Sequence, residues 1–335
     1  MISNYIYSFV SKFVFSPLSY IISFIIIAIL AVMVTALIPL FIGWVDRKYA
    51  ARIESRYGPV YVGPFGLLQN FADLTKMLGK RFIATNIDWF SFNFTPIALA
   101  TSSFAMLLII PLGGPGLEFI SIPYSLLFIY TLLAISPLLL LVAGWGENNK
   151  YALIGGFRGA AQIISYELAL IVVLSSVALL SGSYSINSIV SNQSSIWYIA
   201  YLPVTMIVFI IAGLAIIERE PFDVPEASQE LQAGWKIEYS GIRYGLFLIG
   251  DYVKVTVIAM LVTYLFLGGW NGPFIPGILW FIIKTAIVLM IILTPRWVLG
   301  RPRIDQLIKF GWNWLLPLAV LNLILVELLV VLSWE

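Results

Sequence analysis

The residues best suited to proton chemistry in this chain are acids gathered in one connection between apolar segments. Residues 218–239 read EREPFDVPEASQELQAGWKIEY and contain these acids: Glu218, Glu220, Asp223, Glu226, Glu230 and Glu238. Asp223 and Glu226, with Pro225 between them, predict a capped helix start. On such a helix Asp223, Glu226 and Glu230 share one face, where repulsion favours a shared proton. A proton path and a solvated acidic face are both compatible with this pattern.

Further ionisable residues fall inside apolar segments, where charge is costly and is usually functional or paired. Glu167 lies nine residues beyond Arg158, on the opposite face of an unbroken helix, which predicts an unpaired proton site. Asp251 precedes Lys254 by three residues and shares its helical face. This pair is either a proton relay or a structural ion pair. Lys284 adds a supporting charge near the middle of another apolar segment.

The composition excludes most other chemistry. The chain has 335 residues with no Cys and no His, which excludes disulfides, thiolate metal sites, iron–sulfur ligation and His-based catalysis. We therefore expect no metal site. The net charge of +2 is too small to indicate a nucleic-acid-binding protein. Hydrophobic residues make up 61% and charged residues 11%, far from soluble proteins, so the chain is expected to be an integral membrane protein.

The apolar segments predict one polytopic membrane domain over residues 1–335. Crossing a bilayer takes about 20 mostly apolar residues, and only helices satisfy the backbone within one segment. The fold class is therefore an all-α integral membrane protein with eight transmembrane helices. Their approximate bounds are 18–44, 95–112, 122–143, 152–181, 196–217, 242–268, 274–298 and 311–333. No internal repeat is visible, which disfavours a transporter built from inverted repeats.

The distribution of basic residues predicts the orientation. All Lys and Arg residues except Lys12, Lys254 and Lys284 fall in the odd-numbered connections or at their edges. By the positive-inside rule these connections face the cytoplasm, and both termini lie outside. The even-numbered connections are short or rich in Ser and Asn. We therefore expect a cell-membrane protein. Its basic cytoplasmic connections either bind a partner or serve only to set the orientation of the helices.

The first of these connections, residues 46–81, contains a second feature of interest. Two Gly-Pro pairs, at 58–59 and 63–64, mark rigid turns. The residues after them alternate apolar and polar faces, which predicts an amphipathic surface helix on the cytoplasmic side, with Asp73 and Lys76 spaced to pair. Such a helix frames an opening for an amphipathic ligand or simply anchors the chain at the interface. From the residues alone, the anchor is the favoured interpretation.

Four long blocks then identify a family. In order they are DRKYAARIESRYGPVYVGPFGLLQNFAD, AGWGENNKYALIGGFRGAAQIISYE, EREPFDVPEASQELQAGWKIEYSGIRYGLFLIGDY and RPRIDQLIKFGWNWLLPLAVLNL. In these blocks, across about residues 40–325, the chain resembles the family of membrane subunits numbered 1 or lettered H in respiratory complex I (NADH-quinone oxidoreductase), in its prokaryotic form. This resemblance implies eight spans, a chamber for quinone as substrate, and coupling of quinone reduction to proton translocation.

The resemblance also implies partners and site residues. The partners would be hydrophilic subunits that carry the iron–sulfur clusters, together with antiporter-like membrane subunits, while this chain itself holds no redox centre and no covalent cofactor. The residues matching the quinone chamber are Asp46, Arg47, Phe65, Gly66, Gln69 and Asp73. Those matching the proton path are Glu167, Asp223, Glu226, Glu230, Glu238 and Asp251. We add Glu218 to this path, with supporting charges from Arg158, Arg219, Lys254 and Lys284.

Several departures from the family pattern bear on these assignments. Asp46 stands where the family usually has Glu, and Val60 where it has Asn. A customary acid falls on Ile216, whereas Glu218 and Glu220 are new acids. Two alternatives therefore stay open: the ion-transducing subunit of a membrane-bound hydrogenase-type complex without a quinone, and a stand-alone ion transporter. The electron donor, the choice between H⁺ and Na⁺ and the ion stoichiometry lie beyond the sequence.

Overall fold

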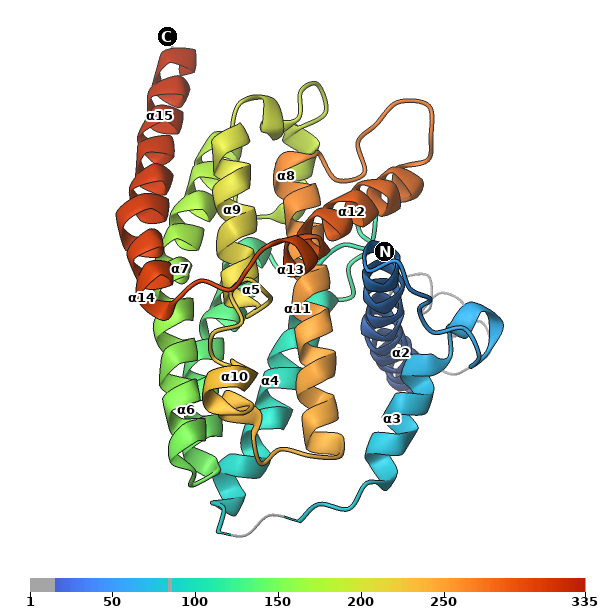
Figure 1. The fold of residues 1–335 in the computed structure, drawn as a ribbon. Helices are drawn as coiled ribbons and strands as arrows, with labels where there is room; N and C mark the ends of the chain where they lie inside the picture. Colours follow the sequence, from blue (N-terminus) through green and yellow to red (C-terminus); the bar gives the residue numbers. More distant parts are fainter. Residues whose placement is uncertain (1–15, 84–85, 335) are drawn as a thin grey trace.

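The computed structural model describes residues 16–83 and 86–334, and over these residues it contains helices and connecting loops without strands (Figure 1). The helices, α and short 3₁₀ or π (η), are α2 (Ser16–Ile53), η1 (Pro64–Gly66), α3 (Gln69–Gly79), α4 (Trp89–Ile109), α5 (Ser125–Ala134), α6 (Ser136–Gly146), α7 (Lys150–Ser181), α8 (Ile186–Asn192), η2 (Tyr198–Ala200), α9 (Pro203–Ile216), α10 (Ser228–Leu231), η3 (Gly234–Lys236), α11 (Ile242–Phe266), α12 (Gly277–Leu293), α13 (Pro295–Val298), α14 (Ile304–Phe310), η4 (Gly311–Leu315) and α15 (Leu316–Trp334).

Seven stretches of helix in the described residues are long and apolar enough to cross a membrane, which confirms the all-helical, multi-pass architecture. They are Ile22–Ile53, Trp89–Ile109, Ser125–Gly146, Lys150–Ser181, Ile242–Phe266, Gly277–Val298 and Ile304–Leu332. The predicted span 196–217 is shorter in the structure, because α9 begins only at Pro203. Pro203 occupies the first helical turn, and Leu202 before it is non-helical (φ −127°, ψ 50°). At 14 residues, α9 reaches about 21 Å.

The connections divide between the two ends of the bundle. At the upper end of Figure 1 the even-numbered connections meet: the Asn187 amide donates to Glu118 at 3.2 Å, and the Asn271 amide donates to the Val190 carbonyl at 2.7 Å. The odd-numbered connections, residues 54–83, 86–88, 147–149, 217–241 and 294–303, form what we call the charged end. Here α3 and α10 lie in the lower half of Figure 1. The predicted location of the N-terminus concerns residues outside the described ranges.

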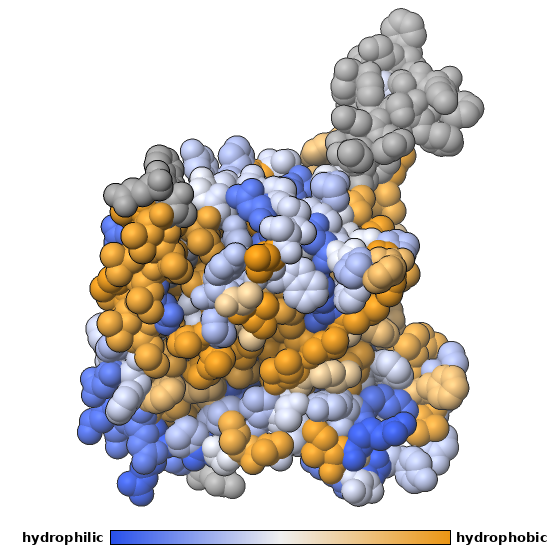
Figure 2. All heavy atoms as spheres, turned by 90° about the horizontal axis from the view of Figure 1, so that it is seen from above, coloured by the Kyte–Doolittle hydropathy of each residue, from blue (hydrophilic) through white to orange (hydrophobic). Residues whose placement is uncertain are grey.

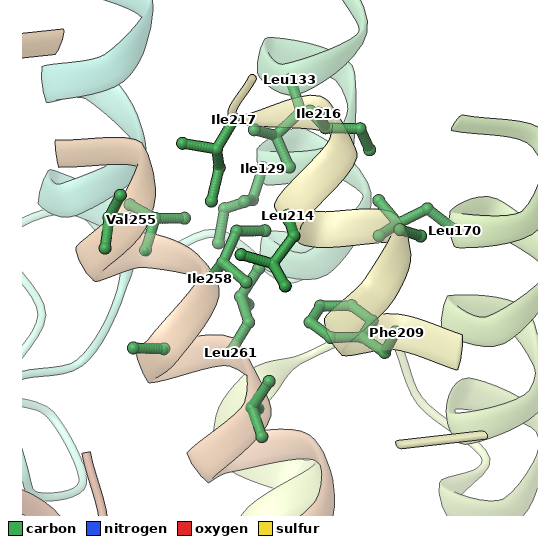
Figure 3. Packing of buried hydrophobic residues seen from close by; sticks show 14 of the residues in the cluster. Ile129, Leu133, Leu170, Phe209, Leu214, Ile216, Ile217, Val255, Ile258 and Leu261 are labelled. Carbon is green, nitrogen blue, oxygen red and sulfur yellow. The ribbon is translucent and has the colours of Figure 1, made fainter. Parts of the chain in front are cut away.

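The core of the bundle is apolar and continuous. Side chains from α5, α7, α9 and α11 meet around Leu170, Phe209, Leu214 and Ile258 (Figure 3). The helix α11 is the most enclosed of the spans, whereas α2 exposes most of its surface. Seen from the end opposite to the charged end, hydrophilic residues form separate groups between broad hydrophobic areas (Figure 2). Exposed large hydrophobic side chains on α2, α12 and α15 suit an outer surface that contacts lipid tails.

On the side of the bundle opposite to the charged end, Lys284 of α12 binds the segment that follows α11. Its ammonium donates to the carbonyls of Leu267, Gly269 and Asn271 at 2.6, 3.1 and 2.6 Å. The Trp197 ring lies 4.1 Å away. These carbonyls lie in the turn that follows α11, which ends at Phe266, so the cation binds this turn and joins it to α12.

We therefore predict that Lys284→Met destabilises the protein. Each buried carbonyl left without a partner costs about 1–3 kcal/mol, so the loss should reach at least that amount. The measurement is thermal unfolding of the purified chain in detergent. Lys309→Met, at an exposed position of α14, is the matched control and should leave the midpoint unchanged. Equal midpoints for the two variants would contradict this role.

Candidate functional site

The candidate site at the charged end is built around the buried carboxylate of Asp46, which is 2% exposed. Arg219, which follows α9, donates to it at 2.9 Å, and Arg296 of α13 at 3.3 Å. The Tyr252 hydroxyl of α11 donates to the same oxygen at 3.2 Å. A buried carboxylate is tolerated only with such partners. Asp46 therefore ties α2, α11, α13 and the acidic connection together.

Arg47 and Asp73 join α2 to the surface helix α3. The guanidinium of Arg47 lies 2.5 Å from the Asp73 carboxylate, and the Gln69 amide donates to Asp73 at 3.3 Å. Asp73 therefore pairs with Arg47 of α2, and not with Lys76 of its own helix as predicted. The reason is that Asp73 faces α2, whereas Lys76 lies exposed on the helix.

The loop before α3 depends on Gly66. Its φ is +76°, and a Cβ atom there would lie 2.2 Å from the Pro59 carbonyl oxygen. Only glycine combines this backbone conformation with so close an approach. The neighbouring Phe65 side chain is 79% exposed, and the Phe65 carbonyl accepts a hydrogen bond from Trp44 at 3.3 Å. Gly66 thus shapes the loop, while the Phe65 ring lies on the surface.

Three pockets meet along one face of α11. The first, about 30 Å³, lies between α2, α3 and α11 beside Arg47 and Asp73. The second, about 370 Å³, opens between α3 and the start of α11. The third, about 190 Å³, contains the acidic residues and is called here the acid cavity. Tyr244, Leu248 and Tyr252 are spaced by four residues and form one stripe of α11 that lines the acid cavity. Leu248 and Tyr252 also line the first pocket, and Tyr244 also lines the second.

Lys236 is the central cation of the acid cavity. Its ammonium forms ion pairs with Glu226 and with Asp251, the latter at 3.0 Å. Burial alone would lower the pKa of Lys236, but Asp251 and Glu226 raise it above its ordinary value. Asp251 therefore bonds to Lys236, in place of the predicted bond to Lys254. Lys254 is buried one turn further along α11.

The helix predicted to begin at Asp223 is absent, because α10 starts only at Ser228 and ends at Leu231. The acids consequently do not share one helical face. Three acids of the connection pair with arginines: Asp223 with Arg301 at 2.7 Å, Glu230 with Arg158 at 2.7 Å, and Glu220 at 3.7 Å with Arg296, which also binds Asp46. These ion pairs offset part of the predicted repulsion, but burial and Glu226 still raise the pKa of Asp223.

Glu218 and Asp223 are the acids whose protonation the site changes most clearly. The Oε1 atom of Glu218 is shielded and makes no hydrogen bond. Burial, together with Glu226, raises the pKa of Glu218 to about 8. Burial and Glu226 likewise raise the pKa of Asp223 to about 7, against the opposing effect of Arg301. A Cβ atom at Gly159 of α7 would lie 2.7 Å from the Glu218 carboxyl, so Gly159 leaves room for this acid.

Other predicted site residues lie outside the acid cavity. Glu167 is buried on α7, and its Oε1 atom makes no hydrogen bond. Glu238 is half-buried, and its backbone N–H donates to Glu147 at 3.3 Å. Glu230 pairs with Arg158 on the surface, its side chain 63% exposed. Lys284 lies at the opposite end. The structure therefore splits the predicted proton path into separate groups.

Sequence reasoning missed several residues that complete the site. Lys236, Arg296 and Arg301 neutralise the acids, and Tyr252 binds Asp46. The one feature of the sequence that could have pointed to Lys236 is its position as a lysine among the acids of residues 218–239. The arginines follow a separate span and reach the acids only through the fold. Among the described residues no group of acids is arranged to hold a metal ion.

Comparisons with known proteins agree on one family. The sequence profile of the family described as NADH dehydrogenase matches residues 24–327. The H 2 subunit of the NADH-quinone oxidoreductase of Geobacter sulfurreducens is 40% identical over 294 residues, covering 85% of this chain and 89% of that protein. The corresponding H 2 subunit of Syntrophobacter fumaroxidans is 39% identical, covering 87% and 90%. The H subunit of Carboxydothermus hydrogenoformans is 38% identical, covering 85% and 82%.

The raised carboxyl pKa values predict how stability depends on pH. Between the ordinary value of 4.5 and about 8, the folded chain holds a proton on Glu218 that the unfolded chain has released. Raising the pH through this window therefore favours unfolding. We expect the unfolding midpoint in detergent to fall from about pH 5 to pH 8, and Glu218→Gln to reduce that fall. Glu54→Gln, at an exposed position, is the control. Parallel curves for the wild type and Glu218→Gln would contradict the assignment.

Proposed function

Because this chain belongs to the NADH dehydrogenase family, we propose that it is the membrane subunit of an NADH-quinone oxidoreductase-type complex that forms the quinone chamber and couples quinone reduction to proton translocation. The observation that carries this proposal is the shared wall of the three pockets. The stripe of Tyr244, Leu248 and Tyr252 on α11 places a ligand pocket directly against a cavity of titratable acids. A charge change in one pocket is then felt in the other.

The pockets beside α3 suit a quinone as substrate. Their walls combine apolar residues such as Leu74 and Met77 with the Arg47–Asp73 pair, and few polar groups within an apolar lining are typical of small-molecule sites. In this proposal Asp46 sets the position of its neighbour Arg47, since Asp46 itself is turned toward Arg219. Gln69 and Gly66 hold α3 and its preceding loop at the pocket.

The acid cavity is proposed as the start of the proton path. Glu218 and Asp223 keep protons near neutral pH, whereas Glu226 and Asp251 are held by Lys236. Quinone reduction consumes two protons. The accompanying change of charge would redistribute protons among these acids and pass the bias to Glu167 and to antiporter-like subunits. Lys254, electrostatically coupled to Glu218 and Asp251, supports this intramembrane continuation.

The charged end is proposed to face the cytoplasm and to dock the hydrophilic subunits. Its Lys and Arg content favours that side of the membrane. The loop between α2 and α3 presents Tyr57 and Tyr61, which are 94% and 99% exposed. Exposed aromatic side chains next to cations are typical of protein interfaces. Electrons would arrive there from iron–sulfur clusters, which a chain without Cys and His cannot hold itself.

A subunit of a hydrogenase-type complex without a quinone is the second candidate. The pocket beside Arg47 is only about 30 Å³, and Val60 replaces a polar residue of the family pattern. In that case the acid cavity would keep its role, and the electrons would reduce protons within a partner subunit. A stand-alone transporter is the third, and it would move ions when reconstituted alone.

The proposed proton path is tested by replacing with Gln both Glu226, which lines the acid cavity, and Glu230, which pairs with Arg158 on the surface. Coupled activity of the purified complex should fall by about a hundredfold, the lower end of a positioned proton donor's contribution, while assembly persists. Quinone reduction and proton uptake by vesicles containing the complex are measured together. Glu54→Gln provides the control. Full activity and full pumping in the double variant would sink the proposal.

Partner identity is tested by purifying the complex through a tag on this chain. We expect a hydrophilic subunit with iron–sulfur clusters to copurify, together with further membrane subunits, and the preparation to reduce a quinone. Copurification without quinone reduction, but with hydrogen evolution, would favour the second candidate. Ion transport by the chain alone would favour the third.

A further inference from the structure

A buried carboxyl group at the charged end takes no part in the steps above. Glu147 follows α6 and is 3% exposed. Its Oε2 atom accepts the backbone N–H of Glu238 at 3.3 Å, whereas its Oε1 atom is shielded and makes no hydrogen bond. An ionised carboxylate enclosed with a single long hydrogen bond is expensive. The geometry therefore favours the neutral acid, with a proton on Glu147.

The groups packed around Glu147 supply no cation to hold it ionised. From the connection before α11 come Glu238, an acid, and Tyr239, a phenol. From α11 comes Arg243, but its guanidinium donates to Asn93 at 2.7 Å and lies over the Phe82 ring. On the side of α4, the Asp88 backbone N–H donates to the Gly146 carbonyl and its carboxylate accepts from Ser91.

This environment raises the pKa of Glu147. Burial is the largest cause and the nearby Glu238 adds to it, against the opposing backbone hydrogen bond, which brings the pKa to about 9. The Glu238 side chain is half-buried, so it also reaches solvent. Glu147 thus holds a proton at a pH where an exposed carboxylic acid has lost it.

Tyr239 connects Glu147 to the larger pocket. Its ring stacks on Phe92, with centroids 4.1 Å apart, and is held edge-on by Phe247. The Tyr239 hydroxyl is buried without a hydrogen bond of good geometry, although the Thr95 hydroxyl lies beside it. The same tyrosine lines the pocket of about 370 Å³. Glu147 and the pocket therefore share a rigidly held phenol.

We propose that Glu147 is a further proton-carrying residue, which holds a proton at rest and exchanges it with Glu238 to supply a second entry for protons beside the acid cavity. The O–H bond of Glu147 breaks as one forms on the Glu238 carboxylate, and the Tyr239 hydroxyl then donates a hydrogen bond to the carboxylate left on Glu147. Glu238 is the group that solvent reaches. This inference rests on the proposed proton coupling and adds a route to it.

The first experiment compares Glu147→Gln with Glu147→Asp in the purified complex. The amide of Gln still accepts the Glu238 N–H and keeps the size of the side chain, but it carries no transferable proton. We expect proton pumping by Glu147→Gln to fall by about a hundredfold with KM for quinone unchanged, and Glu147→Asp to restore most of it with a shifted pH profile. Glu118→Gln, the same change at the opposite end, is the control.

The second measurement reads the proton directly and needs no turnover. Infrared spectra of the complex should contain the carbonyl band of a neutral carboxylic acid that shifts in D₂O, disappears on raising the pH past about 9, and is missing in Glu147→Gln. Glu147→Asp should give a displaced band. If Glu147→Gln fails to assemble, the wild-type and Glu147→Asp spectra decide the question alone.

The outcomes separate this inference from the proposed function. If Glu147→Gln pumps at the wild-type rate with an unchanged pH profile, or if no band belongs to Glu147, the second entry is wrong. If instead the Glu226 and Glu230 double variant also pumps fully, the proposed proton coupling itself has failed. Loss in both sets of variants, with the band present, supports both.

Discussion

The buried ion cluster at Asp46 is the constraint on which the charged end depends. One carboxylate, 2% exposed, accepts from Arg219, Arg296 and Tyr252, which come from three different segments. Enclosed charges are stable only in such company, since an unpartnered one costs several kcal/mol. The need to satisfy Asp46 thus fixes α2 against α11 and brings the acidic connection beside both. The pockets and the acid cavity inherit their positions from this arrangement.

Beside the Asp46 cluster, cations and acids alternate in the acid cavity. Lys236 is buried between Glu226 and Asp251, while Asp223 pairs with Arg301. Glu218 has no such partner and keeps its proton to higher pH. Acids with a raised pKa and acids paired with Lys236 therefore lie within one cavity. Glu147 lies outside the acid cavity, but its pKa is also raised, because the effect of burial is larger than that of its single hydrogen bond.

The departures from the family pattern gain meaning in three dimensions. The customary acid is replaced by Ile216, which packs in the apolar core, while the new acid Glu218 lies two residues on, where α9 has ended. Glu218 interacts electrostatically with Lys254, which is buried on α11.

By itself the sequence determined the helical membrane fold, the family and the end of the bundle that carries the charge. These properties follow from apolar segment length, from basic residues in alternating connections and from long ordered blocks, all of which are local in the chain. Only the tertiary structure decided the partners of each charge. Asp251 pairs with Lys236 and not with Lys254, and Asp73 pairs with Arg47 and not with Lys76. Ion pairing depends on distances of a few ångströms between segments far apart in sequence, and helical spacing cannot supply these distances.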